Sequence, residues 1–133
     1  MIGRASNSEK RSTPRPRDVL RAARRMRAAA LPPQTACEVC DATDPLVLEA
    51  DAASRLCADC AAIGRRLAPV EQHHLGGRSF PVVTCVSANA HRILSALQRA
   101  RGPARRNACE LLYGVADLLY TIAERCDHLE EDL

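Results

Sequence analysis

The spacing of apolar and polar residues predicts a helix near each end of the chain. Residues 1–16 are polar and hold two prolines, which predicts a disordered basic arm. In residues 17–33 apolar side chains recur near helical spacing, so we expect a basic helix that two consecutive prolines end. Residues 104–133 carry a wide apolar stripe from Leu111 to Ile122, which predicts a C-terminal amphipathic helix that packs onto the protein or into a helical dimer.

The centre of the chain changes from helical to strand-like spacing and back. Residues 69–101 contain two short segments that favour strands, a weak one over 69–74 and a stronger, β-branched one over 80–86. A glycine-rich loop separates them. Ser87 is a suitable N-cap for a helix that we expect over 88–101. The predicted order is therefore strand, loop, strand, helix.

The composition suggests that this small protein needs more than an apolar core. The chain has 133 residues, no Trp, one Phe and two Tyr, so Ala, Leu and Val must fill the interior. A core of this kind is a weak source of stability at this length. Seven cysteines are present and could provide an additional cross-link or metal site.

Four of those cysteines fall in a separate module, residues 36–68. They form two CxxC pairs separated by sixteen residues, a spacing typical of a structural zinc site. Strands over 46–49 and 55–57 and a helix from Ala58 would give a treble-clef-like arrangement. Four unconnected thiols or two disulfides are the alternative. The predicted zinc ligands are Cys37, Cys40, Cys57 and Cys60.

The other three cysteines, Cys85, Cys109 and Cys126, have no CxxC partner, and we expect them to be small buried apolar side chains. The N-terminal region is rich in Arg and Ser and shows no secretory signal, so we expect a cytoplasmic protein with reduced thiols. No apolar stretch is long enough to span a bilayer, and a membrane partner is not expected. Together these features indicate a small α+β protein: a treble-clef-like zinc module and a hairpin followed by a helix, flanked by N- and C-terminal helices.

Charge is concentrated at the two ends of the chain. The net charge is only +3, but the first thirty residues are strongly basic and the end of the chain is acidic. Eighteen Arg against a single Lys favour forked donors suited to phosphate, although a GC-rich genome would also enrich Arg. The basic helix could lie along a nucleic-acid backbone or be a solvated helix on the surface. Its candidate phosphate ligands are Arg21, Arg24 and Arg25.

Three of the four histidines lie within nineteen residues. His73 and His74 are adjacent in the first predicted strand, so their side chains should point to opposite faces. His91 lies near the start of the following helix and can fold back across the hairpin. One imidazole could then bind a metal while another faces a water or the bond to be cleaved. The alternative is a solvated His pair on a loop and one histidine that caps a helix.

The residues HHLGGR, followed by PVVTCVSANAHR, resemble the HNH endonuclease motif, the ββα-metal fold in its phage and bacterial form. The resemblance implies that His74 is the general base and that His73 and His91 bind a catalytic divalent cation, Mg²⁺, Mn²⁺ or Ni²⁺. It also implies a DNA substrate and a product with a 5′ phosphate. No Asn occupies the family's middle position upstream of the helix, so Asn89 is the candidate. The candidate phosphate ligands near the motif are Arg78 and Arg92.

The sequence therefore predicts a metal-dependent DNA endonuclease of the HNH type, held together by a structural zinc. A catalytically inactive module that binds zinc and either nucleic acid or protein is the main alternative. A third hypothesis is a regulatory protein whose acidic C-terminal helix forms a homodimer.

Overall fold

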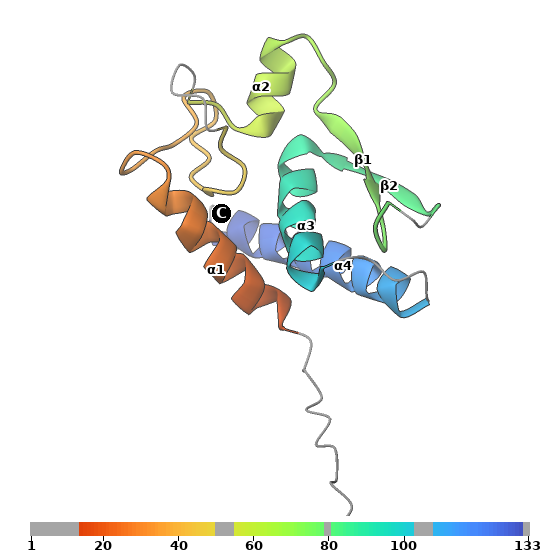
Figure 1. Ribbon diagram of the computed structural model, residues 1–133. Coiled ribbons are helices and arrows are strands. Elements are labelled where there is room, and N and C mark those ends of the chain that lie inside the picture. The colour runs from red at the N-terminus through yellow and green to blue at the C-terminus, as the bar shows by residue number, and fades with distance from the viewer. Residues whose placement is uncertain (1–13, 50–54, 79–80, 103–107, 132–133) are drawn as a thin grey trace, which may run out of the picture.

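The computed structural model describes residues 14–49, 55–78, 81–102 and 108–131, and the side chains of 108–110 and 127–131 lie outside the description. These residues form a small α+β protein with four helices and one two-stranded antiparallel sheet (Figure 1). The predicted arm over 1–16 therefore lies almost entirely outside the described residues. In chain order the elements are α1 (Pro16–Ala29), α2 (Ala58–Gly64), β1 (Val70–His74), β2 (Val83–Ser87), α3 (Ala88–Arg101) and α4 (Ala108–Glu131).

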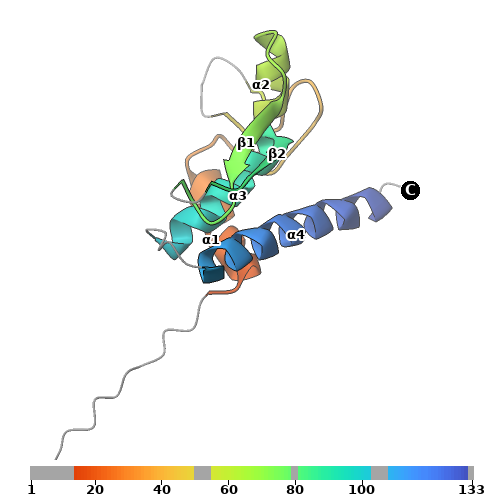
Figure 2. The same cartoon turned by 90° about the vertical axis from the view of Figure 1, so that its right-hand side faces the viewer.

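Helix α3 is the central element and packs against every other helix and strand (Figures 1 and 2). It begins where the sequence predicts, because the Ser87 hydroxyl accepts a hydrogen bond of 3.2 Å from the Ala90 amide. Its apolar face, with Ile93, Leu94 and Leu97, is buried. The helix ends at Gly102, whose φ of 78° is readily adopted by glycine.

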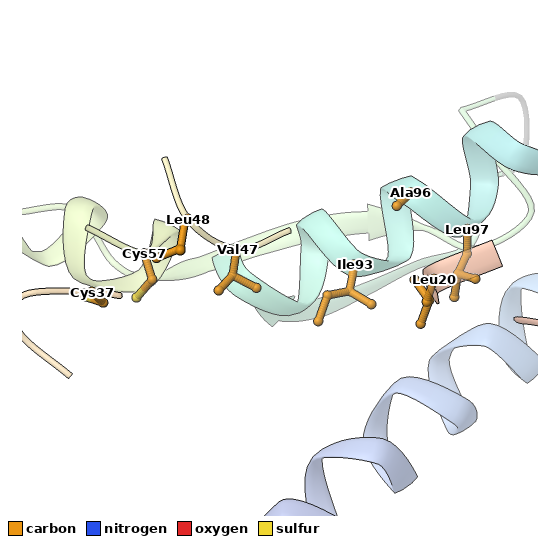
Figure 3. Close-up of a cluster of buried hydrophobic side chains, with 8 residues drawn as sticks. All are labelled: Leu20, Cys37, Val47, Leu48, Cys57, Ile93, Ala96 and Leu97. Atoms are coloured by element: carbon orange, nitrogen blue, oxygen red, sulfur yellow. The ribbon is translucent and has the colours of Figure 1, made fainter. Parts of the chain in front are cut away.

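A cluster of buried apolar side chains joins α1, α3 and the cysteine module (Figure 3). Leu20 of α1 is fully buried and packs with the apolar face of α3. Two cysteines of the predicted zinc site lie in the same cluster, so the module is part of the core and not an appendage. The cluster consists of Leu20, Cys37, Val47, Leu48, Cys57, Ile93, Ala96 and Leu97.

The hairpin of β1 and β2 pairs Val70 with Ser87 and His74 with Val83. Its first strand agrees with the prediction to within one residue, while β2 is shorter than expected because it begins at Val83. Within the cysteine module, the expected hairpin is reduced to a single bridge between Leu48 and Cys57. Two backbone hydrogen bonds of 2.9 Å form this bridge, from the Glu49 amide to the Leu56 carbonyl and from the Ala58 amide to the Val47 carbonyl.

Charged pairs hold α1 and α4 in place. The Arg24 guanidinium on α1 donates to Asp44 in the cysteine module at 2.8 Å and to Glu124 on α4 at 2.8 Å. About two turns earlier along α4, Arg101 of α3 pairs with Asp117, a carboxyl group that is only 1% exposed. Burial raises the pKa of Asp117, and the Arg101 charge opposes that change. Two ion pairs thus attach α4 to the rest of the protein.

Helix α4 also makes a close backbone contact with the loop that follows β1. A Cβ atom at Gly114 would lie 2.5 Å from the Gly76 amide nitrogen and 3.1 Å from the Leu75 carbonyl carbon. Gly76 itself has a φ of 78°, in the left-handed region that favours glycine. Two glycines therefore allow α4 to touch the loop next to the histidine pair.

The expectation that the unpaired cysteines are buried was wrong for the two whose side chains the structure describes. Cys85 on β2 and Cys126 on α4 are both exposed, because each lies on a face of its element that no described segment covers. The side chain of Cys109 lies outside the described residues. Within the ranges that the structure covers, no helix is both long and apolar enough to cross a membrane.

We predict that Gly114→Ala destabilises the protein. Helix propensity alone would make this change favourable by about 1 kcal/mol, but the clash with the Gly76 backbone should cost about 1–3 kcal/mol. Urea unfolding followed by circular dichroism measures the sign. Gly64→Ala is the matched control, since nothing lies within 4 Å of its added Cβ, and it should be neutral or stabilising. A stabilised Gly114→Ala variant would contradict the close contact.

Candidate functional site

The four predicted zinc ligands come together. One ligand atom from each of Cys37, Cys40, Cys57 and Cys60 lies within 4.8 Å of the others. The Sγ atoms of Cys40 and Cys57 are 3.7 Å apart. A tetrahedral zinc with Zn–S bonds of about 2.3 Å separates its sulfurs by about 3.8 Å. The thiols thus have the number, type and spacing that a structural zinc requires.

The surroundings of Cys37 and Cys60 shift the pKa values of their thiols in opposite directions. Burial raises the pKa of Cys37, but hydrogen bonds from backbone amides, including those of Cys57 and Val39, outweigh it and bring the pKa to about 6. Burial and the neighbouring thiols raise the pKa of Cys60 well above its ordinary value. A divalent cation bound by the four cysteines would displace the protons of the remaining thiols and stabilise them as thiolates. The cluster can therefore hold a metal ion such as zinc.

A pair of hydrogen bonds joins the cysteine cluster to helix α3. Asp59 lies between Cys57 and Cys60 in the first turn of α2. Its Oδ1 accepts a hydrogen bond of 2.8 Å from the backbone amide of Asn89. In return, the Asn89 Oδ1 accepts from the Asp59 amide at 3.1 Å. Each side chain therefore satisfies an amide in the first turn of the other helix. Asn89 is only 7% exposed, and its side chain faces α2, where it fixes the start of α3.

The hairpin and α3 bring two of the three histidines into contact. His73 is 2% exposed, and its ring lies edge-on to the His91 ring with the centroids 5.2 Å apart. Burial, followed by the proximity of His91 and His74, lowers the pKa of His73 to about 4. His73 is therefore neutral near pH 7, which is the form that binds metal ions.

Glu71 orients the second ring of this pair. Its Oε2 lies 2.8 Å from the Nδ1 of His91, and Glu71 and His73 share one face of β1 because they are two residues apart. A proton on Nδ1 shared with the carboxylate leaves Nε2 of His91 as the lone-pair nitrogen. This carboxylate–imidazole arrangement is common behind metal-binding histidines.

His74 follows on the opposite face of β1 and is partly buried. Its backbone carbonyl accepts a hydrogen bond of 2.6 Å from the side-chain amide of Gln98 on α3. This bond fixes the end of the strand at the histidine pair. Arg78 lies four residues further along and is exposed.

The predicted phosphate ligands differ in their surroundings. Arg24 forms forked hydrogen bonds to Glu124 and to Asp44, and these bonds raise the pKa of its guanidinium above the ordinary value. The guanidinium is thus paired with two carboxylates of the protein and is not proposed as a phosphate ligand. Arg92 donates to Glu49 at 3.2 Å and stays partly exposed. Arg21 and Arg25 are exposed on α1.

Comparison of the chain with protein-family models, with curated proteins and with solved structures found no match in any of the three. The functional argument therefore rests on the geometry. Among the residues that the structure describes, the four cysteines form the one group of three or more His, Cys, Asp or Glu side chains with ligand atoms within 4.8 Å of one another. The histidine site contributes fewer protein ligands than the cysteine cluster.

Three residues of this region were not predicted from the sequence: Asp59, Glu71 and Gln98. Asp59 could have been noticed as an acidic side chain in the first turn of the helix that begins at the second CxxC. The signal for Glu71 is weaker: it lies two residues before His73 in a predicted strand, so the two side chains share one face. Nothing in the sequence around Gln98 indicates its contact with His74, because the two residues are brought together only by the packing of α3 on β1.

We predict that the purified protein holds one zinc per chain and that Cys60→Ser loses it. Loss of the metal removes several kcal/mol of folding free energy, which corresponds to a fall of at least about 10 °C in melting temperature. Elemental analysis and thermal unfolding, with and without a chelator, measure both effects. Cys126→Ser is the matched control, since its thiol is exposed and lies outside the cluster. Equal metal content in both variants would contradict the assignment.

We also predict that burial of neutral His73 makes stability depend on pH. The pKa of His73 is about 4 in the folded protein against an ordinary value of 6.5, so the unfolded chain binds more protons between pH 6.5 and pH 4. This contribution is present above pH 6.5 and is lost as the pH falls toward 4, by about 2 kcal/mol between pH 7 and pH 5. Between pH 7 and pH 5, the free energy of unfolding of His73→Phe should fall by about 2 kcal/mol less than that of the parent protein. Urea unfolding with zinc present measures both values. An equal fall in both proteins would contradict the prediction.

Proposed function

We propose that the chain is a metal-dependent DNA endonuclease of the HNH type, with a zinc-binding module beside the catalytic hairpin and helix. The observation that carries the proposal is the contact between the His73 and His91 rings, 5.2 Å apart, where β1 meets the start of α3. The order of strand, loop, strand and helix supports it, since the resemblance of HHLGGR and NAHR to the HNH motif implies that order.

The residues fit a catalytic cation to the extent of two imidazoles. His73 is neutral near pH 7, and Glu71 holds the Nδ1 side of His91, so each ring can offer a nitrogen to the same ion. The remaining positions would belong to water and to the substrate phosphate. Two imidazole ligands favour Mn²⁺, Ni²⁺ or Zn²⁺ over Mg²⁺ by affinity. When bound, the ion stabilises negative charge on the phosphate and on the leaving 3′ oxygen.

The chain's own groups supply the other requirements of phosphodiester hydrolysis. His74, at the end of β1, accepts the proton of the attacking water as general base. The hydrogen bond from Gln98 to its carbonyl oxygen holds the backbone at this position. Asn89 acts as a positioning residue, because its bonds with Asp59 fix the turn of α3 from which His91 projects.

A second candidate function is a zinc-bearing module that binds nucleic acid without cleaving it. The observation that favours it is the state of Asn89, whose side-chain oxygen is used by the Asp59 amide. No asparagine lies between His74 and the start of α3, where the family's middle position falls. The two candidates share the fold and the charge pattern and differ only in the chemistry at His74.

We predict that the parent protein nicks supercoiled plasmid with Mn²⁺, Ni²⁺ or Mg²⁺ and that His74→Ala lowers the rate at least about a hundredfold, as loss of a general base does. Gln72→Ala is the matched control, because Gln72 is exposed and lies on the same face of β1 as His74. It should cut at the parental rate.

The outcomes of this assay separate the two candidates. Equal activity in the parent and in His74→Ala would assign the cleavage to a contaminant and contradict the endonuclease proposal. Retained DNA binding with no cleavage in the presence of any of the three metals would support the second candidate. Binding alone cannot decide between them, since phosphate contacts give salt-dependent affinity in both cases.

A further inference from the structure

We propose that a basic cavity between α1 and α3, which we call the arginine cavity, binds a nucleic-acid phosphate next to the histidine site. The cavity has a volume of about 410 Å³. This proposal rests on the proposed function for the identity of its ligand. The residues that line the cavity are Arg27, Leu46, His91, Arg92, Ser95 and Arg99.

The cavity is formed by one face of α3. His91, Ser95 and Arg99 recur at intervals of four and therefore lie one above another along the helix, with Arg92 beside them. This face lies opposite the buried side of α3, where Leu94 and Leu97 pack. Arg27 approaches from the last turn of α1. Three arginines and a serine thus line one space.

Among the described residues, none of the side chains that line the arginine cavity is acidic. Arg27 donates one bond of 3.0 Å to the Leu48 carbonyl oxygen and forms no ion pair with any described carboxylate. Arg92 is paired with Glu49, but that carboxylate also faces Arg65 at 3.6 Å. The Arg99 guanidinium has no ion pair in the part of the chain that the structure describes.

Three neighbouring guanidinium groups repel one another, and an anion between them removes that cost. Arginine is also the side chain whose forked donors match two oxygens of a phosphate. The cavity could hold more than ten waters at about 30 Å³ each, so it can admit a phosphate group with part of its hydration shell.

The place of the cavity indicates which phosphate it binds. His91 belongs both to the cavity and to the histidine pair, since its ring lies against His73 and also lines the space beside Ser95. A nucleic-acid strand whose scissile phosphate lies at the histidines can therefore place a neighbouring phosphate of the same strand between the arginines. The cavity would fix the register of the backbone without reading its sequence.

The test uses full-length, zinc-loaded protein in the His74→Ala background, so that cleavage does not interfere. Binding of a fluorescent 20-base-pair DNA duplex is measured by anisotropy at several salt concentrations. We expect Arg99→Gln to weaken binding about tenfold at low salt and to reduce the salt slope by about 0.9, the loss of one phosphate contact. Arg27→Gln should act in the same direction. Thermal unfolding verifies that each variant is folded.

Arg66→Gln is the matched control, because Arg66 is exposed and lies outside the cavity while carrying the same charge. If Arg99→Gln binds DNA as tightly as Arg66→Gln, or if both weaken binding equally, the arginine cavity is not a phosphate site. Binding to anionic lipid vesicles without binding to DNA would also overturn the proposal. A parent that does not cleave, combined with the expected loss in Arg99→Gln, would reject the catalytic proposal and retain this one.

Discussion

Two hydrogen bonds between Asp59 and Asn89 connect the halves of this protein, and both candidate sites depend on them. Asp59 lies inside the second CxxC pair, and Asn89 lies two residues before His91 in the first turn of α3. The thiol cluster and the imidazole pair are therefore joined by the hydrogen bonds between Asp59 and Asn89. Both Cys57 and Cys60 lie within two residues of this pair of hydrogen bonds, and so does His91.

The parts of the fold that local signals determine could be predicted from the sequence. Helix α3 has the expected bounds, because Ser87 caps its start and glycine ends it. The cysteine cluster forms because paired CxxC turns bring thiols together whenever the intervening chain folds back. The opposite directions of His73 and His74 follow from strand alternation, and their different burial agrees with it.

The remaining features depend on packing between distant segments, which one sequence does not display. Arg24 was interpreted as a phosphate ligand because it lies in a basic run, but its partners Asp44 and Glu124 are 20 and 100 residues away. The exposure of Cys85 could not be foreseen, since VVTCV over 82–86 is a nearly continuous apolar run, which is typical of a strand covered on both faces and does not indicate an exposed one. The arginine cavity joins α1 to α3 across more than sixty residues, and only the fold shows that Arg27 and Arg99 line the same space.

The contact of Gly114 with Gly76 gives the protein an order of assembly. The loop after the histidine pair is supported by a helix that leaves the ribosome roughly forty residues later, and domains fold as the nascent chain emerges. The segments of the cysteine module and the hairpin precede α4 in the chain and are therefore synthesised before it. A chain truncated before α4 would leave the loop after His74 uncovered on the side where Gly114 now lies.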